Sequence, residues 1–273
     1  TYPEDVGEGG GGRNELVANL ALFVTLAGDP QRGWQLAEPL LELGPSAALI
    51  RGAVSASTAL GHLGRVDDAV KVLDRALETF GIIGIEATGL SQRVTAATRA
   101  GTNCWRGDLP AAWADTETAL HSAVSEFQIS AANYASTGLH ILAGRPSKAL
   151  PLMERAIEWY GRTNGGSTEY RWMLARLALV HANAGNPDLA ERALVEFDAD
   201  DSPGIVFDQE AEVARARVAL LRGFPEEARR LLRATHASVA AHGLVGGELM
   251  AAYELVRLDR VEEVAERMAE LAP

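Results

Sequence analysis

Three polar residues at matching positions in the chain are the first candidates for chemistry. Each of them lies four residues before a glycine that is expected to form a turn: they are Asn103, His140 and His181. Stacked repeats would place them in a row, but equivalent positions in neighbouring repeats lie on the order of 10 Å apart, the spacing of packed helices. A zinc ion holds its ligands at roughly 2 Å. We therefore expect a row of hydrogen-bonded residues at helix interfaces and no metal site.

The remaining polar groupings lack the spacing of a catalytic or cofactor site. The carboxylate pairs Asp67-Asp68, Glu226-Glu227 and Glu262-Glu263 open expected helices, where the helix dipole favours negative charge. The glycine-rich segment 165–168 has neither a preceding strand nor a following lysine, so it is interpreted as an inter-repeat loop rather than a phosphate-binding loop. Cys104, the single cysteine, is interpreted as a small buried residue. We expect no enzyme activity, no catalytic residue and no cofactor.

Composition narrows the class of protein further. The net charge of −12 disfavours a nucleic-acid surface, because the field of the protein would repel phosphates. No apolar run approaches the roughly 18 residues of a membrane helix, and the N-terminus lacks the pattern of a signal peptide. One cysteine fits a reducing compartment. We expect a cytoplasmic protein without direct contact to nucleic acid or membrane.

A short pattern recurs seven times along the chain. A turn residue, usually glycine, is followed five positions later by a small residue that opens an alanine- and leucine-rich run. The seven pairs are Gly28 and Gly33, Gly64 and Ala69, Gly107 and Ala112, Gly144 and Ala149, Gly185 and Ala190, Gly223 and Ala228, and Asp259 and Val264. Successive turns are 36 to 43 residues apart. Glycine ends a helix in the left-handed conformation, so the pattern predicts helical hairpins.

Two further positions recur at a fixed distance from the turns. Seven residues before each turn lies a small residue: Ala21, Ser57, Ala100, Thr137, Ala178, Ala216 and Ala252. Nine residues after most turns lies a large apolar residue: Leu73, Met153, Leu194, Leu232 and Met268. These residues resemble the tetratricopeptide family, whose repeat has about 34 residues. The chain departs from that pattern in its longer repeats, in Thr116 and Ala37 at the large apolar position, and in having only Pro45 at the terminal proline position.

The fold we expect is all-α, a tetratricopeptide-like α-α superhelix of about seven helical hairpins. We expect a flexible linker over 1–13 and a single repeat domain over 14–273. The first helix of each hairpin is expected near 14–27, 48–63, 88–106, 125–143, 167–184, 207–222 and 245–258. The second helices are expected to end at glycines such as Gly44, Gly81, Gly161 and Gly243.

The tetratricopeptide resemblance implies that the first helices line a concave face where ligands bind. Residues of that face, counted back from each turn, are Arg51, Trp105, Tyr134, Trp172, Asn183, Arg217 and Tyr253. Aromatic and arginine side chains can hold a peptide, protein or small-molecule effector by stacking and bidentate hydrogen bonds. The alternative is that half or more of these residues belong to the ordinary core or surface.

The C-terminal part of the repeat region also resembles a larger family. The stretch from Val213 to Leu271, particularly 222–228 and 257–264, is similar to the alanine-rich helical array of large ATP-binding, LuxR-type (maltose-regulator-like) bacterial transcriptional regulators. The resemblance implies a non-catalytic sensor and protein-interaction module, whose parent carries an ATPase domain and a helix-turn-helix domain outside this chain. The alternative is a tetratricopeptide adaptor unrelated to transcription.

Overall fold

The chain is all-α in the computed structural model, which describes residues 11–83, 92–121, 126–164, 168–199, 205–258 and 261–271. These residues form fourteen α-helices and one 3-10 helix, and no strand. The first helices are α1 (Gly11–Leu26), α3 (Ala47–His62), α5 (Gln92–Arg106), α7 (Glu126–Leu142), α9 (Thr168–Asn183), α11 (Ile205–Leu221) and α13 (Val245–Arg257). The second helices are α2 (Pro30–Ala37) with η1 (Glu38–Glu42), α4 (Val66–Ile83), α6 (Leu109–His121), α8 (Pro146–Asn164), α10 (Pro187–Asp198), α12 (Pro225–Ala241) and α14 (Val261–Leu271).

The turn glycines form the hairpin corners that the sequence predicts. The left-handed conformation, with φ between 67° and 103°, is adopted by Gly28, Gly64, Gly107, Gly144, Gly185 and Gly223. At the first corner the amide of Asp29 donates back to the carbonyl of Val24 at 3.1 Å, and the Asp29 carboxylate caps α2 through the amide of Arg32 at 2.9 Å. The seventh corner, Asp259, lies outside the described residues.

Undersized side chains bring the two helices of each hairpin together. The small residue seven positions before each turn is at most 2% exposed in all seven hairpins. In the first hairpin the contact leaves no room for a side chain, because a Cβ added to Gly33 would lie 1.9 Å from Oγ1 of Thr25 and 2.9 Å from the carbonyl oxygen of Ala21. The small residues are therefore buried in every hairpin, as predicted, and in the first hairpin the backbone of Gly33 lies against that of Ala21.

Two expected helix ends differ in the structure. Gly81 and Gly161 lie inside α4 and α8, and neither has a positive φ. Gly161 instead leaves room for the next hairpin, since an added Cβ would lie 3.3 Å from the ring of Tyr170. Gly243 does follow α12 with a φ of 66°, and Gly44 follows η1.

The start of the helical region also differs. Helix α1 begins at Gly11, so residues 11–13 of the expected linker are helical. The rest of that linker lies outside the described residues.

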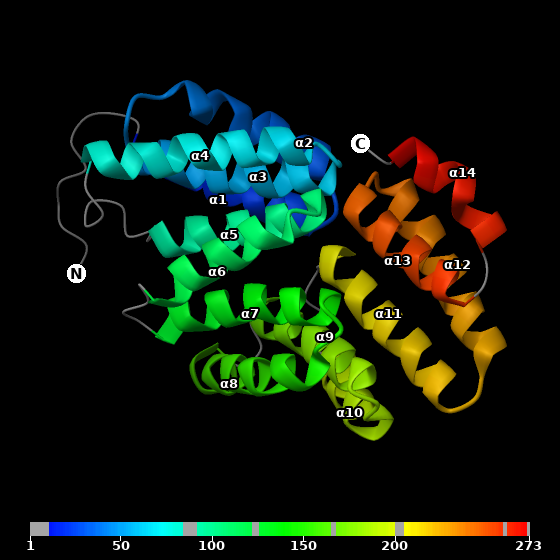
Figure 1. The fold of residues 1–273 in the computed structure, drawn as a ribbon. Coiled ribbons are helices and arrows are strands. Elements are labelled where there is room, and N and C mark those ends of the chain that lie inside the picture. Colours follow the sequence, from blue (N-terminus) through cyan, green and yellow to red (C-terminus); the bar gives the residue numbers. More distant parts are fainter. Residues whose placement is uncertain are drawn as a thin grey trace.

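The hairpins stack in chain order and the stack curves back on itself. Each second helix contacts the first helix of the next hairpin, and successive first helices also contact one another. Figure 1 shows the chain descending from α1–α4 through α5–α8 and returning through α11–α13 to the N-terminal hairpins. As a result α1 contacts α11 and α3 contacts α13, although these helices are far apart in sequence. Among the described residues, no helix combines the length and apolar character needed to cross a bilayer.

Candidate functional site on the inner helices

The two ends of the hairpin stack meet through an apolar cluster, which we call the closure contact. Leu22 and Leu26 of α1 pack with Val206 and Phe207 of α11. Leu244, just before α13, is fully buried in the same cluster. Because apolar burial contributes roughly 25 cal/mol per Å², this contact stabilises the curved arrangement in addition to the interfaces between neighbouring hairpins.

Trp105 completes the closure contact from α5. Its ring packs directly on the backbone of Gly61, where an added Cβ would lie 2.2 Å from the ring, and a Cβ added to Gly246 of α13 would lie 3.7 Å from it. The ring also lies 4.8 Å from that of His62, tilted by 59°. Trp105 nevertheless remains 44% exposed. This predicted site residue is therefore a wedge between the two ends, open to solvent on one side.

Inside the curve, three first helices share a polar network. Nε of Arg176 in α9 donates to Glu210 of α11 at 2.6 Å, and another guanidinium nitrogen donates to the Tyr134 hydroxyl of α7 at 3.1 Å. The Tyr134 hydroxyl lies 3.5 Å from Glu210, and the guanidinium carbon lies 4.3 Å from the centre of the Tyr134 ring. The Arg176 and Glu210 side chains are only 14% and 10% exposed. A buried pair of this kind is costly to break on one side only, because the remaining charge stays uncompensated.

Burial sets the protonation states of this network. Burial raises the pKa of the Tyr134 phenol far above its usual value, so the hydroxyl remains a hydrogen-bond donor at neutral pH. Burial by itself would lower the pKa of Arg176, but the charge of Glu210 raises it overall. Cys104 of α5 lies close enough for Arg176 to influence it, yet burial dominates and raises the pKa of the thiol to about 11. The thiol is therefore almost entirely protonated at neutral pH.

Trp172 lies beside this network and is fixed by packing. Its ring stacks on that of Phe207 with centroids 4.1 Å apart and an interplanar angle of 23°. Both Trp172 and Tyr134 pack against the cluster of the closure contact. The structure thus brings together two of the predicted site residues, Tyr134 and Trp172. We call these two residues, together with Arg176 and Glu210, the inner wall.

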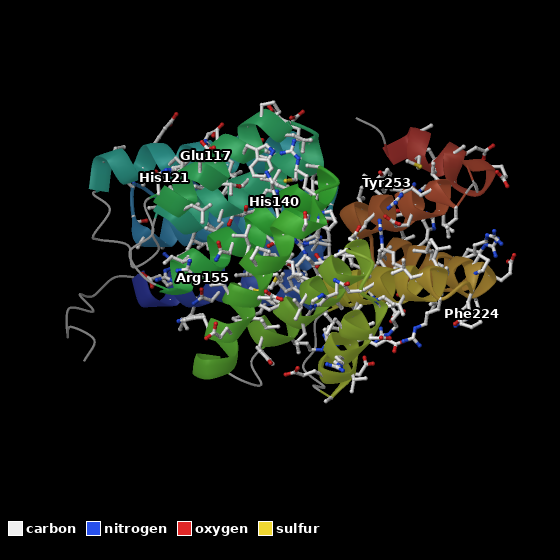
Figure 2. All side chains as sticks on the ribbon, turned by 60° about the horizontal axis from the view of Figure 1, so that its bottom comes forward. Glu117, His121, His140, Arg155, Phe224 and Tyr253 are labelled. Carbon is white, nitrogen blue, oxygen red and sulfur yellow. The ribbon has the colours of Figure 1, made fainter. Side chains whose placement is uncertain are left out.

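The other predicted residues lie apart from that pair. Arg217 bonds to Glu254 of α13 at 2.5 Å, and Arg51 pairs with Glu15 of α1 at 3.4 Å. Asn183 donates to the carbonyl of Leu179 in its own helix at 2.7 Å. Tyr253 is 55% exposed, and Figure 2 shows it on the C-terminal hairpins, well away from His140 on the central ones. None of these contacts involves Tyr134 or Trp172.

The three residues of the expected polar row have different surroundings in the structure. Asn103 donates to Asp115 at 2.9 Å, as expected for a helix-interface hydrogen bond. His140 instead packs against the ring of Trp113 at 4.8 Å, and Nδ1 of His140 and of His181 makes no hydrogen bond within the described residues. In the described part of the chain no group of three or more histidine, cysteine, aspartate or glutamate residues is arranged to hold a metal ion.

Sequence reasoning missed the partners of the predicted residues. Arg176 and Glu210 are the central ion pair of the inner wall, and Phe207 and Gly246 receive the two tryptophans. Both residues of the pair are charged positions within first helices, but α11 also carries Asp208, Glu212, Arg215 and Arg217, so charge alone did not single out the pair. Pairing them required knowing how neighbouring hairpins are rotated relative to one another.

No protein-family model matches the chain, and no curated protein matches it.

Proposed function

We propose that this chain is a non-catalytic sensor and protein-interaction module of a multidomain bacterial transcriptional regulator. The observation that carries the proposal is the closure contact between the two ends of the hairpin stack. A contact between ends can separate while each hairpin keeps its neighbours, so the array can adopt a closed and an open state. An effector that binds one state better than the other shifts the balance between them.

The contacts of the inner wall indicate which of the two states binds the effector. Tyr134 and Trp172 already contact Arg176 and Phe207, so an effector gains access to them when the ends separate. Its observed affinity then depends on how often the ends separate, because only that fraction of molecules is competent to bind. The half-exposed Trp105 is the part of the closure contact that an effector can reach first.

The regulator assignment rests on the resemblance of Val213–Leu271 to LuxR-type regulators, and the coding sequence on both sides of this chain tests it. A phosphate-binding loop motif upstream and a helix-turn-helix pattern downstream support the regulator. If neither is encoded, the adaptor function replaces it, since a curved helical stack suits that role equally.

Effector binding tests the sensor role. Thermal-shift screening against metabolite and peptide libraries identifies ligands, whose Kd is then measured with the wild-type chain, Trp105→Ala and Trp172→Ala. We expect roughly a tenfold change in Kd, equivalent to about 1.4 kcal/mol, in at least one variant. Leu142→Ala is the matched control, because Leu142 is a 58% exposed apolar residue on α7. Unchanged affinity of every ligand in both variants would lead us to abandon the role of the inner wall.

A further inference from the structure

Two cores of large apolar residues lie on either side of the third hairpin, α5–α6. The first two hairpins bury Leu49 and Ile50 in one core, and the fifth hairpin, α9–α10, buries Leu194 and Phe197 in another. Figure 1 shows α5 and α6 between α1–α4 and α7–α8. Among the described residues, the buried members of the cluster that joins the third hairpin to α7 are alanines: Ala96, Ala119 and Ala132. The middle of the stack is therefore packed with smaller side chains than the parts it connects.

Equivalent positions of the repeat show the same difference between the third and the fifth hairpin. The positions compared lie twelve and five residues before the turn glycine, and nine and twelve residues after it. The four pairs are Thr95 and Met173, Thr102 and Val180, Thr116 and Leu194, and Ala119 and Phe197. All eight residues are at most 5% exposed. Because stabilisation by burial grows with the apolar area removed from water, the third hairpin gains less from packing than the fifth.

Two buried polar atoms of α5 have no hydrogen-bond partner within the described residues. One is Oγ1 of the fully buried Thr95, and the other is Oδ1 of Asn103, whose amide nitrogen donates to Asp115. A buried polar atom without a partner has lost its hydrogen bonds to water and gained none in return. Local opening that admits water restores these bonds, so both atoms favour the opening of α5.

The third hairpin is also tied to the second through charge. Nη1 of Arg99 in α5 donates to Asp74 of α4 at 2.7 Å, and Nε donates to Asp115 of α6 at 3.0 Å. The Asp74 side chain is 50% exposed, and an ion pair with an exposed member contributes little to stability. This pair therefore orients α5 on α4 without preventing a small rotation between the two hairpins.

We propose that the third hairpin is the joint at which the stack bends when its two ends separate. The inference rests on the proposed sensor function and names the element that regulates it. Small side chains at an interface allow packed helices to slide past one another. Since α5 carries Trp105, which lies against Gly61 and next to Gly246, a movement of α5 withdraws the ring from the closure contact. Substitutions in the third hairpin then change the balance between the two states without touching the inner wall.

Hydrogen exchange of the full chain, followed by mass spectrometry, tests the joint. We expect the amides of α5 and α6 to exchange at least about tenfold faster than those of α9 and α10, because opening the third hairpin exposes less apolar surface. Thr95→Val replaces the unpartnered hydroxyl by a methyl group and should slow exchange in α5 about tenfold. Thr235→Val in α12 is the matched control, since that buried hydroxyl donates to the carbonyl of Leu231 at 2.9 Å. The control should leave exchange in α5 unchanged.

X-ray scattering tests whether the joint controls the separation of the ends. Val245→Asp, which places a charge in the closure contact, should raise the radius of gyration. Adding Thr95→Val to this variant should reverse part of the increase, whereas adding Thr235→Val should not.

The proposal is overturned if α5 and α6 exchange no faster than α9 and α10, or if Thr95→Val leaves exchange in α5 unchanged. It is also overturned if the double variant with Thr95→Val is as expanded as Val245→Asp alone, because the stack then bends elsewhere. If Val245→Asp does not expand the molecule, the ends do not separate, and the sensor mechanism fails together with the joint. That result is distinguishable from the others, in which the ends separate but the third hairpin does not control them.

Discussion

His62 is a neutral histidine packed beside Trp105 at the closure contact. Burial lowers its pKa from 6.5 to about 4. The unfolded chain therefore takes up a proton near pH 6.5, while the folded chain does so only near pH 4. The contribution of His62 to the free energy of unfolding is complete above pH 6.5, falls as the pH falls through this window, and stops changing below about pH 4.

We expect this residue to account for a loss of about 3 kcal/mol between pH 7 and pH 4, since one pKa unit corresponds to about 1.4 kcal/mol. Urea unfolding of the wild type and of His62→Leu at both pH values measures it. The loss should be smaller in His62→Leu by that amount, whereas His242→Leu, at an exposed site, should behave as the wild type. Equal losses in His62→Leu and the wild type would show that His62 is not a buried neutral base.

At the scale of the helices, two glycines inside helices differ in what surrounds them. Gly33 of α2 and Gly101 of α5 are both inside helices, where alanine is normally better by up to about 1 kcal/mol. Only Gly33 is in a tight contact, with the carbonyl of Ala21 and the hydroxyl of Thr25 where a Cβ would lie. Gly101 has no such neighbour within 4 Å.

The two glycines therefore predict opposite effects of the same substitution. Gly33→Ala should lower the free energy of unfolding by about 1 to 3 kcal/mol through overpacking, despite the gain in helix propensity. Gly101→Ala should raise it by about 0.5 to 1 kcal/mol. Chemical denaturation of both variants gives the comparison. If Gly33→Ala instead raised the free energy of unfolding, the first hairpin would have room for a methyl group at Gly33, and the close contact with Ala21 and Thr25 would be wrong.

At the scale of the whole molecule, separation of the closure contact can be measured by the alkylation rate of Cys104. Burial raises the pKa of Cys104 to about 11, so at pH 8 roughly one thiol in a thousand is ionised and alkylation is slow. Separating the ends would hydrate this part of the inner wall, bring the pKa back toward its usual value of 9.0 and accelerate alkylation by up to about a hundredfold.

Two variants act on the closure contact from opposite sides. Trp105→Ala removes the wedge next to Cys104, and Val245→Asp places a charge where Val245 lies against Gly64. Both should increase the rate of Cys104 alkylation by iodoacetamide and the radius of gyration measured by X-ray scattering, while Leu142→Ala changes neither. An effect of Trp105→Ala without one of Val245→Asp would be local to α5 and would contradict a shared closure contact.

Much of the fold is determined by the sequence itself. Glycine turns and small residues at fixed distances from them specify a helical hairpin, because both requirements arise within about fifteen residues of chain. The helix ends were less determined: Gly81 and Gly161 remain helical, since glycine does not stop a helix unless the chain adopts a positive φ there. The all-α fold class and six of the hairpin corners were therefore predictable.

Only the tertiary structure decided what the inner residues do. Small rotations between hairpins accumulate along the stack, and they bring α11 and α13 back to α1 and α3. That return brings Gly246 of α13 to Trp105, and it packs Tyr134 against the cluster that joins α1 and α11. No local pattern encodes the sum of six such rotations. The sequence by itself could name the side chains on the first helices, while the curvature of the whole stack determined which of them are enclosed and which, on α1, remain exposed.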